Sequence, residues 1–394
     1  MHDGRQHGPA FQSRSTICIP IVFLLIIHSA RAFITKHGHR PSTRVFAEEA
    51  EGEASRRAAL TRIVAALPAS PALAAEAAAR APAEHVVRTP LEYVTTLNAY
   101  VVHYYLFGER FGAIVDTGSP FLTAPATCST RSYKYLWGCY RPERTSDSGY
   151  PDTYVALDNN LGVVAWRKAG FAFDAVGSVP ERELVFGVFG PALLDGPGGV
   201  FLGLIRDTDA RIYPSFLGQT GYDSFRVDLR RPGDGARGSG PELVLSTAPL
   251  IREDYIPLVR DLNRRYKASV CHYAAIASRF EVNGVPLASS KTKPIYVIFD
   301  SGCSGMSVSE ELFERRNLQA RRNREKSLWG KVAVAFATRE GREVRLEATQ
   351  PLTTAVDNRT LSRYRGPIVV MGLAFLDGLA MTIDAGKGKL LFSR

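Results

Sequence analysis

The sequence Ala113-Ile114-Val115-Asp116-Thr117-Gly118-Ser119 recurs 184 residues later as Val297-Ile298-Phe299-Asp300-Ser301-Gly302-Cys303. In each copy an apolar run, typical of a buried strand, ends in Asp-Thr/Ser-Gly, a triplet typical of a turn. One copy alone would indicate no more than a turn after a strand. Two copies, one in each half of the globular part of the chain, indicate a shared chemical role for the two aspartates.

The chain around these two copies predicts a mostly-β protein from about Val86 onward. Short strand-forming runs alternate with Gly, Pro, Asn and Asp, and no short repeat is visible. A flexible loop is predicted over 231–240, and helices only over 309–316 and within 251–266. Strands are expected at 100–106, 113–116, 161–166, 184–189, 242–245, 296–300, 331–338 and 381–384.

The composition bounds the kind of protein. A chain of 394 residues predicts about two folded units plus extensions. The net charge is +10, and the basic run 315–326 is interpreted as a solvated helix face; because no nucleic-acid module accompanies it, we expect no nucleic-acid partner. The five cysteines form no CxxC pair and no Cys/His cluster, which argues against a zinc site. Cys128 and Cys139 close a short loop and are a candidate disulfide in an oxidising compartment.

Residues 1–32 are predicted to be a signal peptide. Arg5 and Arg14 precede an apolar run at 17–27, and small residues follow it just before Phe33. The run is short for a membrane span, although a single membrane anchor is the alternative. We expect this segment to be cleaved, so that no membrane association remains in the mature form.

Residues 33–85 are predicted to be a further targeting region. The stretch 33–47 is basic, carries hydroxyl residues and lacks acids, as transit peptides do. Arg56-Arg57 and an Ala-rich stretch ending in Ala72-Leu73-Ala74 resemble a lumenal export signal. The whole order resembles the stacked targeting of algae with secondary plastids and predicts the plastid, with the thylakoid lumen favoured. Secretion or an endomembrane location is the alternative, and 58–83 can instead be an amphipathic helix of the mature protein.

From about residue 88 to its end, the chain resembles the pepsin-like family of aspartic peptidases. The two Asp-Thr/Ser-Gly loops carry the resemblance, together with the apolar-apolar-Gly segments Phe201-Leu202-Gly203 and Val370-Met371-Gly372, which cross the loops in that family. The resemblance implies a bilobal, mostly-β acid-protease fold. Its two barrel-like lobes, residues 86–230 and 231–394, would flank the active-site cleft.

The resemblance implies that Asp116 and Asp300 are the catalytic carboxylates of an endopeptidase. Two carboxylates held about 3 Å apart do not both ionise readily, so they share a proton and lose their protons in coupled steps. The ionised carboxylate takes a proton from a bound water as it attacks the peptide carbonyl, and the protonated partner donates a proton. The expected partner is a polypeptide substrate, the protein is expected to be a monomer, and neither metal nor cofactor is needed.

The neighbours of the two aspartates have roles implied by the same resemblance. Thr117 and Ser301 are expected to cross-link the two loops by hydrogen bonds, and Ser119 to hydrogen-bond Asp116. Gly118 and Gly302 keep side chains away from the carboxylates. Tyr154, ahead of a hairpin-like sequence, is the candidate flap tyrosine that covers the substrate.

The sequence departs from the family pattern at four places. Pro120 stands where a small residue is usual, and Thr123 replaces the tryptophan that normally braces the flap tyrosine. The flap sequence reads Tyr154-Val155-Ala156-Leu157 rather than the usual Tyr-Gly-Thr/Asp-Gly. Cys303 stands where threonine is usual.

The fourth departure, Cys303, bears on the pH dependence of activity. A thiol donates hydrogen bonds weakly, so the ionised carboxylate is less stabilised and the lower pKa of the pair should rise. An optimum in mild acid follows from this hypothesis. Cys303 is interpreted as a buried inert thiol, with a redox role together with Cys271 as the alternative.

A protein of another class, a catalytically silent relative that binds peptides or inhibits an enzyme, is the main rival function. Such relatives usually lack one aspartate of the pair. Both Asp116 and Asp300 are present in this chain. The sequence therefore favours an active endopeptidase.

Overall fold

The computed structural model describes most of the chain from residue 84 onward. The predicted signal and targeting segments up to residue 83, the centre of the 231–240 loop, Cys128 and most of the basic run 315–326 lie outside the described residues. These predictions therefore stay untested. The described residues are 84–125, 137–157, 160–173, 182–189, 200–208, 214–231, 240–266, 270–287, 293–316, 327–356 and 367–394.

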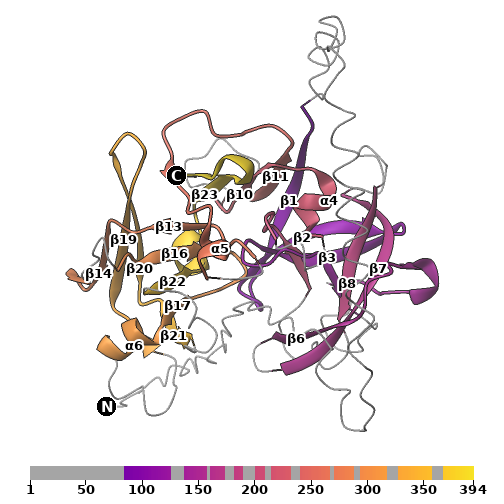
Figure 1. Cartoon of the computed structure of the whole chain (residues 1–394), viewed down its shortest axis with the longest axis horizontal. Helices are drawn as coiled ribbons and strands as arrows, with labels where there is room; N and C mark the ends of the chain where they lie inside the picture. The colour runs from indigo at the N-terminus through magenta and orange to yellow at the C-terminus, as the bar shows by residue number, and fades with distance from the viewer. Residues whose placement is uncertain are drawn as a thin grey trace, which may run out of the picture. The chain divides into compact units, whose positions relative to one another are not determined.

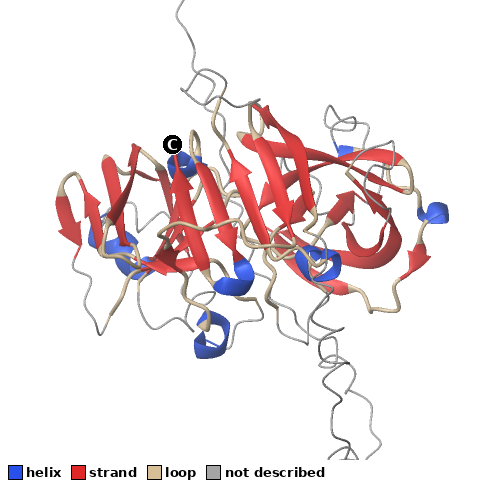
Figure 2. Ribbon diagram, turned by 90° about the horizontal axis from the view of Figure 1, so that it is seen from above, coloured by secondary structure: helices blue, strands red, loops and turns tan. Residues whose placement is uncertain are grey.

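The described chain is mostly β, as the sequence predicts, and strands dominate the ribbon in Figure 2. Each predicted strand is present within a few residues of its expected bounds. These strands are β2 (Ala99–Leu106), β3 (Glu109–Asp116), β7 (Asn160–Ala172), β8 (Arg182–Phe189), β11 (Glu242–Ser246), β16 (Tyr296–Phe299), β19 (Lys331–Ala337) and β23 (Ala380–Asp384).

Further short strands complete the sheets. They are β1 (Val86–Val94), β4 (Thr123–Pro125), β5 (Ser146–Asp147), β6 (Thr153–Leu157), β9 (Phe201–Gly203), β10 (Ser224–Asp228), β12 (Ile256–Pro257), β13 (Ala274–Ile276), β14 (Arg279–Val282), β15 (Val285–Leu287), β17 (Met306–Ser309), β18 (Ser327–Leu328), β20 (Glu343–Thr349), β21 (Leu352–Val356), β22 (Ile368–Met371) and β24 (Lys389–Ser393).

Helices are short in the described chain. The predicted helix over 309–316 is α6 (Glu310–Arg316). The helix predicted within 251–266 is α5 (Leu262–Tyr266), at the end of that stretch. The earlier residues of the stretch include β12, which pairs with β24, so a long-range strand contact takes the place of a local helix there. The others are α4 (Phe216–Thr220), α8 (Leu373–Leu376) and the 3-10 turns η3 (Pro142–Arg144) and η6 (Ala385–Lys387).

Strand β1 joins two parts of the largest sheet. Its first residues, as far as Pro90, pair with β11, and from Leu91 onward it pairs with β2. The fourteen-stranded sheet therefore runs from β12, β24, β23, β10 and β11 through β1 to β2, β7, β8 and β4. Figure 1 shows β10, β11 and β23 between β2, β3, β7 and β8 on one side and the six-stranded sheet β13-β16-β22-β17-β21-β18 on the other. A third sheet contains β15, β14, β19 and β20.

The strands that lead to the two aspartates are among the most deeply buried. All residues of β3 from Phe111 to Asp116 are buried, and so are all four of β16. Each strand also pairs in parallel with a second buried strand, β3 with β9 and β16 with β22. Parallel strands covered on both faces carry continuous apolar runs rather than alternation, which explains the two repeated sequences.

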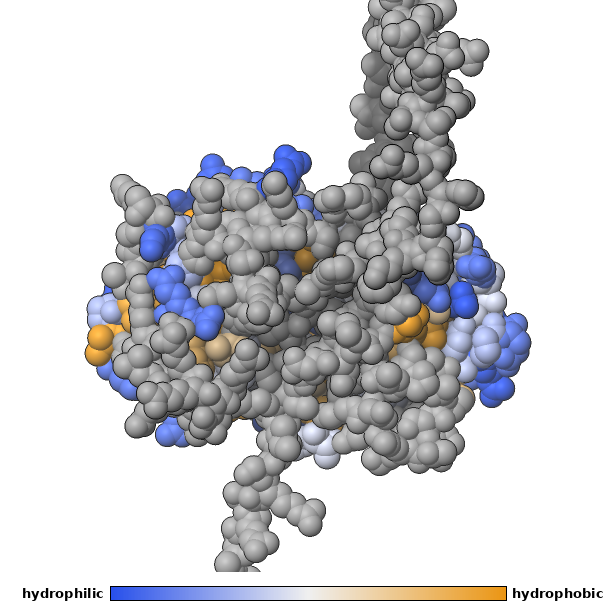
Figure 3. Space-filling model, turned by 60° about the horizontal axis from the view of Figure 1, so that its bottom comes forward, coloured by the Kyte–Doolittle hydropathy of each residue, from blue (hydrophilic) through white to orange (hydrophobic). Residues whose placement is uncertain are grey.

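The exposed large hydrophobic side chains of the described chain are few and lie on different elements. They are Val86, Tyr150, Val163, Ile276 and Val285. The face drawn in Figure 3 accordingly shows small orange groups among blue ones where residues are described. Isolated exposed hydrophobic residues of this kind are ordinary and indicate no docking surface.

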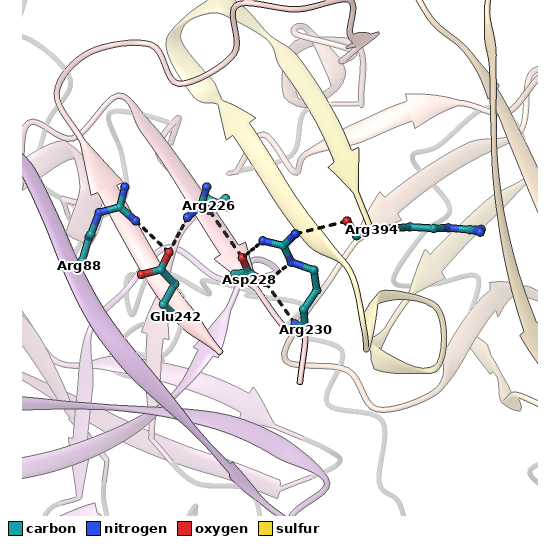
Figure 4. Close-up of polar contacts among 6 residues, drawn as sticks. All are labelled: Arg88, Arg226, Asp228, Arg230, Glu242 and Arg394. Carbon is teal, nitrogen blue, oxygen red and sulfur yellow. Dashed lines mark hydrogen bonds and ion pairs between the residues drawn. The ribbon is translucent and has the colours of Figure 1, made fainter. Parts of the chain in front are cut away.

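A charged cluster links the neighbouring strands β1, β11 and β10 to the C-terminal residue (Figure 4). Glu242 on β11 accepts hydrogen bonds from Arg88 and Arg226 on its two neighbours. Asp228, only 4% exposed, is held by Arg230, whose Nε lies 2.8 Å from the carboxylate. Burial alone would raise the pKa of Asp228, but the hydrogen bonds and charge of Arg230 outweigh it and hold the pKa below its usual value.

We predict that Asp228→Asn destabilises the protein at neutral pH by about 1–3 kcal/mol, because it removes charge-assisted bonds at a buried site. A lowered native pKa contributes stability above the unfolded value, about 3.9, that is lost as the pH falls through the native pKa. Urea unfolding should therefore show the difference between the variant and wild type shrinking as the pH falls below about 3.9 and through the native pKa. Asp147→Asn, at an exposed pair, is the control and should change little. An undiminished difference in acid would contradict the prediction.

Candidate active site

The two loops predicted to carry catalysis meet in the structure. Asp116 ends β3 and Asp300 follows β16, and both side chains are buried, at 2% and 3% exposed. Each carboxylate accepts a hydrogen bond from the glycine two residues later: 2.7 Å from Gly118 N to Asp116 Oδ1, and 2.9 Å from Gly302 N to Asp300 Oδ1. These two bonds hold each carboxylate in a fixed orientation inside its own loop.

The hydroxyl groups of Thr117 and Ser301 cross-link the loops, as predicted. The Thr117 amide donates to Ser301 Oγ at 3.1 Å, and the Ser301 amide donates to Thr117 Oγ1 at 2.9 Å. Each hydroxyl also donates to a carbonyl of the opposite strand, Thr117 to Phe299 at 2.9 Å and Ser301 to Val115 at 2.7 Å. The four bonds are reciprocal, so neither loop can move without breaking contacts with the other.

Gly118 and Gly302 allow the carboxylates to approach. A Cβ atom at Gly118 would lie 2.5 Å from Cγ of Asp300, and one at Gly302 would lie 2.7 Å from Oδ1 of Asp116. Real Cβ atoms do not approach other atoms this closely. Each glycine therefore leaves the space that the opposite carboxylate occupies, as the sequence predicts.

The two apolar-apolar-Gly segments cross the loops, again as predicted. Strand β9 runs parallel to β3, and the Leu204 amide just after it donates to the Asp116 carbonyl at 2.8 Å. Strand β22 runs parallel to β16, and the Asp300 amide donates to the Met371 carbonyl at 3.0 Å. A side chain at Gly203 or Gly372 would collide with the backbone of the loop that it crosses.

Both carboxyl groups of the pair have raised pKa values, because burial disfavours their charged forms. For Asp116, bonds from Ser119, Gly118 and Asp300 oppose this effect. For Asp300 the negative charge of Asp116 adds to burial, so its pKa rises well above the usual value, although the Gly302 and Cys303 amides lower it. The pair therefore retains a proton at acidic pH, and of the two carboxyl groups Asp300 is the one more readily protonated.

Two neighbours differ between the loops. Ser119 Oγ is buried and makes no hydrogen bond of standard geometry, yet its proximity lowers the pKa of Asp116. At the corresponding place in the second loop Cys303 is fully buried. Cys271 is buried too, and its Sγ lies 3.5 Å from the Arg260 carbonyl. Cys271 and Cys303 are both free thiols in the structure. The alternative of a redox role for these two cysteines therefore stays a prediction.

Tyr154 lies where the sequence places the flap. It belongs to β6, which pairs with β7 as a hairpin in which Tyr154 is opposite Val163. The side chain of Tyr154 is outside the described set. Trp166 on β7 donates from Nε1 to Thr153 Oγ1, at the start of β6, at 3.0 Å.

The contacts that Trp166 and Thr123 make were not predicted from the sequence. The Trp166 ring is 1% exposed and lies 4.8 Å, edge on, from the ring of Phe121, which follows the first loop. Thr123 instead accepts a hydrogen bond from the Phe201 amide at 2.7 Å and so fixes strand β9. Trp166 thus links the start of β6 to the segment that follows the first loop.

His272 is a further residue of the site that the sequence did not reveal. It directly precedes Tyr273, whose hydroxyl donates to the Leu204 carbonyl at 2.7 Å. Burial lowers the pKa of His272 to about 4, against a hydrogen bond to the Gly118 backbone that raises it, and its Nδ1 is buried without a partner. A segment far along the chain therefore supports the first loop, a contact without a local sequence signal.

Other site chemistries and the comparisons add no further assignment. Within the described part of the chain no group of three or more His, Cys, Asp or Glu side chains is placed to hold a metal ion. No helix among these residues has the length and apolarity that crossing a membrane requires. The Cys128–Cys139 disulfide stays a prediction, because Cys128 is outside the described set.

No protein-family model matches the sequence, and no curated protein is significantly similar to it.

We predict that Asp300→Asn raises the thermal stability of the protein at neutral pH, by a Tm shift on the order of a few degrees. A carboxyl whose native pKa is raised favours the folded state only while it is protonated. That contribution is present below the unfolded pKa and is lost as the pH rises through the native pKa. Asparagine at position 300 stays neutral and avoids this loss of stability, so the gain in Tm of the variant over wild type should shrink in acid.

Calorimetry at about pH 7 and about pH 3 measures this difference. Asp384→Asn is the comparison at another buried carboxylate. Asp384 accepts from two backbone amides, Leu250 and Ile251, and its replacement should destabilise instead. Equal losses of stability in both variants at neutral pH would contradict the assignment of a strained carboxylate pair.

Proposed function

We propose that the protein is an aspartic endopeptidase of the pepsin-like kind, with Asp116 and Asp300 as its catalytic pair. The observation that carries the proposal is the reciprocal cross-link of Thr117 and Ser301, which brings two buried carboxylates together. Structural ion pairs join opposite charges, whereas this arrangement forces two like charges together at a cost. Such an arrangement is expected where chemistry needs a shared proton.

The proposed mechanism needs one proton on the pair and one water between the carboxylates. Asp300, whose pKa is raised further, holds the proton, and ionised Asp116 accepts a proton from the water. The water oxygen attacks the carbonyl carbon of the peptide while Asp300 donates its proton to the carbonyl oxygen. Collapse of the tetrahedral intermediate breaks the C–N bond: the proton held by Asp116 passes to the leaving amine, and Asp300 takes back a proton from a hydroxyl as the carbonyl re-forms. No covalent intermediate forms.

The bilobal organisation is part of the same proposal. Residues 86–230 would form one lobe and 231–394 the other, each with one aspartate, one parallel partner strand and one crossing glycine. The hairpin of β6 and β7, with Trp166 at its base, would cover bound substrate. The plastid lumen, reached through the segments before residue 86, stays a prediction that N-terminal sequencing of the protein from its native compartment can test.

Catalytic assignment predicts loss of proteolysis on neutralising either aspartate. Wild-type protein should degrade an unfolded polypeptide at about pH 4–6, and Asp116→Asn or Asp300→Asn should lower the rate by about a thousandfold or more. A peptide transition-state analogue with a statine-type hydroxyl should block the wild type. Binding of peptides without cleavage by the wild type would instead indicate the silent, peptide-binding alternative. Asp147→Asn, at the surface, should keep full activity.

The residue after Gly302 is predicted to set the acidic limit of activity. A threonine hydroxyl at position 303 would stabilise ionised carboxylate better than the thiol, so Cys303→Thr should lower the pKa of the pair. The acidic limb of the kcat/KM profile should then move to lower pH. Cys303→Ala adds no donor and is the control. An acidic limb that does not move in Cys303→Thr would contradict this prediction.

A further inference from the structure

A surface pocket of about 550 Å³ lies beside the first catalytic loop. Its walls come from the segment that follows β9, from the start of α4 and from the turn around α5. The side chains that matter for its chemistry are Arg206, Asp207, Arg260, Asn263, Arg264 and Cys271.

Three guanidinium groups give the pocket a positive character. Arg206 is already paired, with Asp223 at 2.8 Å and more loosely with Asp207 at 3.6 Å. Arg260 donates to the Gly386 carbonyl at 2.8 Å. Neither Arg260 nor Arg264 forms an ion pair with any described carboxylate, and both are exposed at the pocket. Asp207 is the only carboxylate among the described lining residues, so the cations are in excess.

The pocket is anchored to the catalytic loop on two sides. The Ile205 amide donates to the Ser119 carbonyl at 2.9 Å, and Arg206 is the next residue. On the other wall, Tyr273, two residues after Cys271, donates from its hydroxyl to the Leu204 carbonyl, and the Leu204 amide donates to the Asp116 carbonyl. Consecutive Cα atoms are about 3.8 Å apart, so the wall residue Arg206 is only one such step along the chain from a residue that bonds to the loop. An extended substrate advances roughly 3.3 Å per residue, so we expect the side chain that enters the pocket to lie within a few residues of the bond to be cleaved.

We propose that this pocket binds an acidic side chain of the polypeptide substrate and gives the enzyme a preference for Asp or Glu near the cleaved bond. The proposal rests on the peptidase function proposed above. Guanidinium groups bind carboxylates through paired charge-assisted hydrogen bonds, and Arg260 and Arg264 have donors to spare. Ordinary apolar subsites would not distinguish Asp from Asn, whereas this pocket would.

Matched peptides test the preference. One set carries a single Asp at each position from four residues before to four residues after the cleaved bond, and the second set carries Asn instead. Wild type should cleave the Asp peptide about tenfold faster in kcat/KM at one position or two. In the double variant Arg260→Gln, Arg264→Gln this ratio should fall to nearly one, and added salt should lower the wild-type ratio. Arg252→Gln, at an exposed arginine outside the pocket, is the control and should keep the ratio.

The outcomes separate the two proposals. An Asp/Asn ratio of one at every position in wild type, or one that survives in the double variant, overturns the pocket assignment while leaving the peptidase intact. Failure of wild type to cleave any peptide overturns the peptidase. In that case fluorescence anisotropy of the labelled peptides tests the pocket. Tighter binding of the Asp peptide, lost in the double variant, supports it, whereas equal binding overturns it. A Tm raised by inorganic phosphate, without peptide preference, would indicate a small-anion site instead.

Discussion

The reciprocal hydrogen bonds between Thr117 and Ser301 are the constraint on which the rest of the site depends. Each hydroxyl uses its proton for a carbonyl of the opposite strand and accepts from the amide of the opposite loop, so all four groups are satisfied. All of them are buried, and an unsatisfied buried polar group costs about 1–3 kcal/mol. Separating the loops would leave several such groups at once, which keeps Asp116 and Asp300 together despite their repulsion.

That constraint explains why so much of the site could be predicted from sequence. A loop that needs a hydroxyl after its aspartate and a glycine after that has a short, local pattern, and the pattern occurs twice. The strands before it, β3 and β16, are buried on both faces and so read as plain apolar runs. The crossing glycines, Gly203 and Gly372, follow from the same close approach, since a Cβ there would strike the loop backbone.

The residues that the sequence did not reveal act through long-range contacts. Tyr273, next to His272, bonds to the Leu204 carbonyl from the other half of the chain, and no local spacing marks this pair. Trp166 packs against Phe121 after the first loop, but it comes from β7, so no pattern around Asp116 marks it. The helix predicted within 251–266 is present as α5, and the sequence also indicates why it begins only at Leu262. Pro257 disfavours helix at Ile256, and both residues pair with β24.

The backbone of the two loops is nearly symmetric, but their surroundings are not, and that difference bears on which carboxyl holds a shared proton. Both loops have the same glycine bond and the same hydroxyl cross-link. Asp116 has Ser119 and the Gly118–His272 contact beside it, whereas Asp300 has Cys303 and bears the charge of its partner. Equal environments would leave the proton equally distributed. In the mechanism proposed above, unequal ones determine which carboxyl donates and which accepts, so that one repeated motif would supply both an acid and a base.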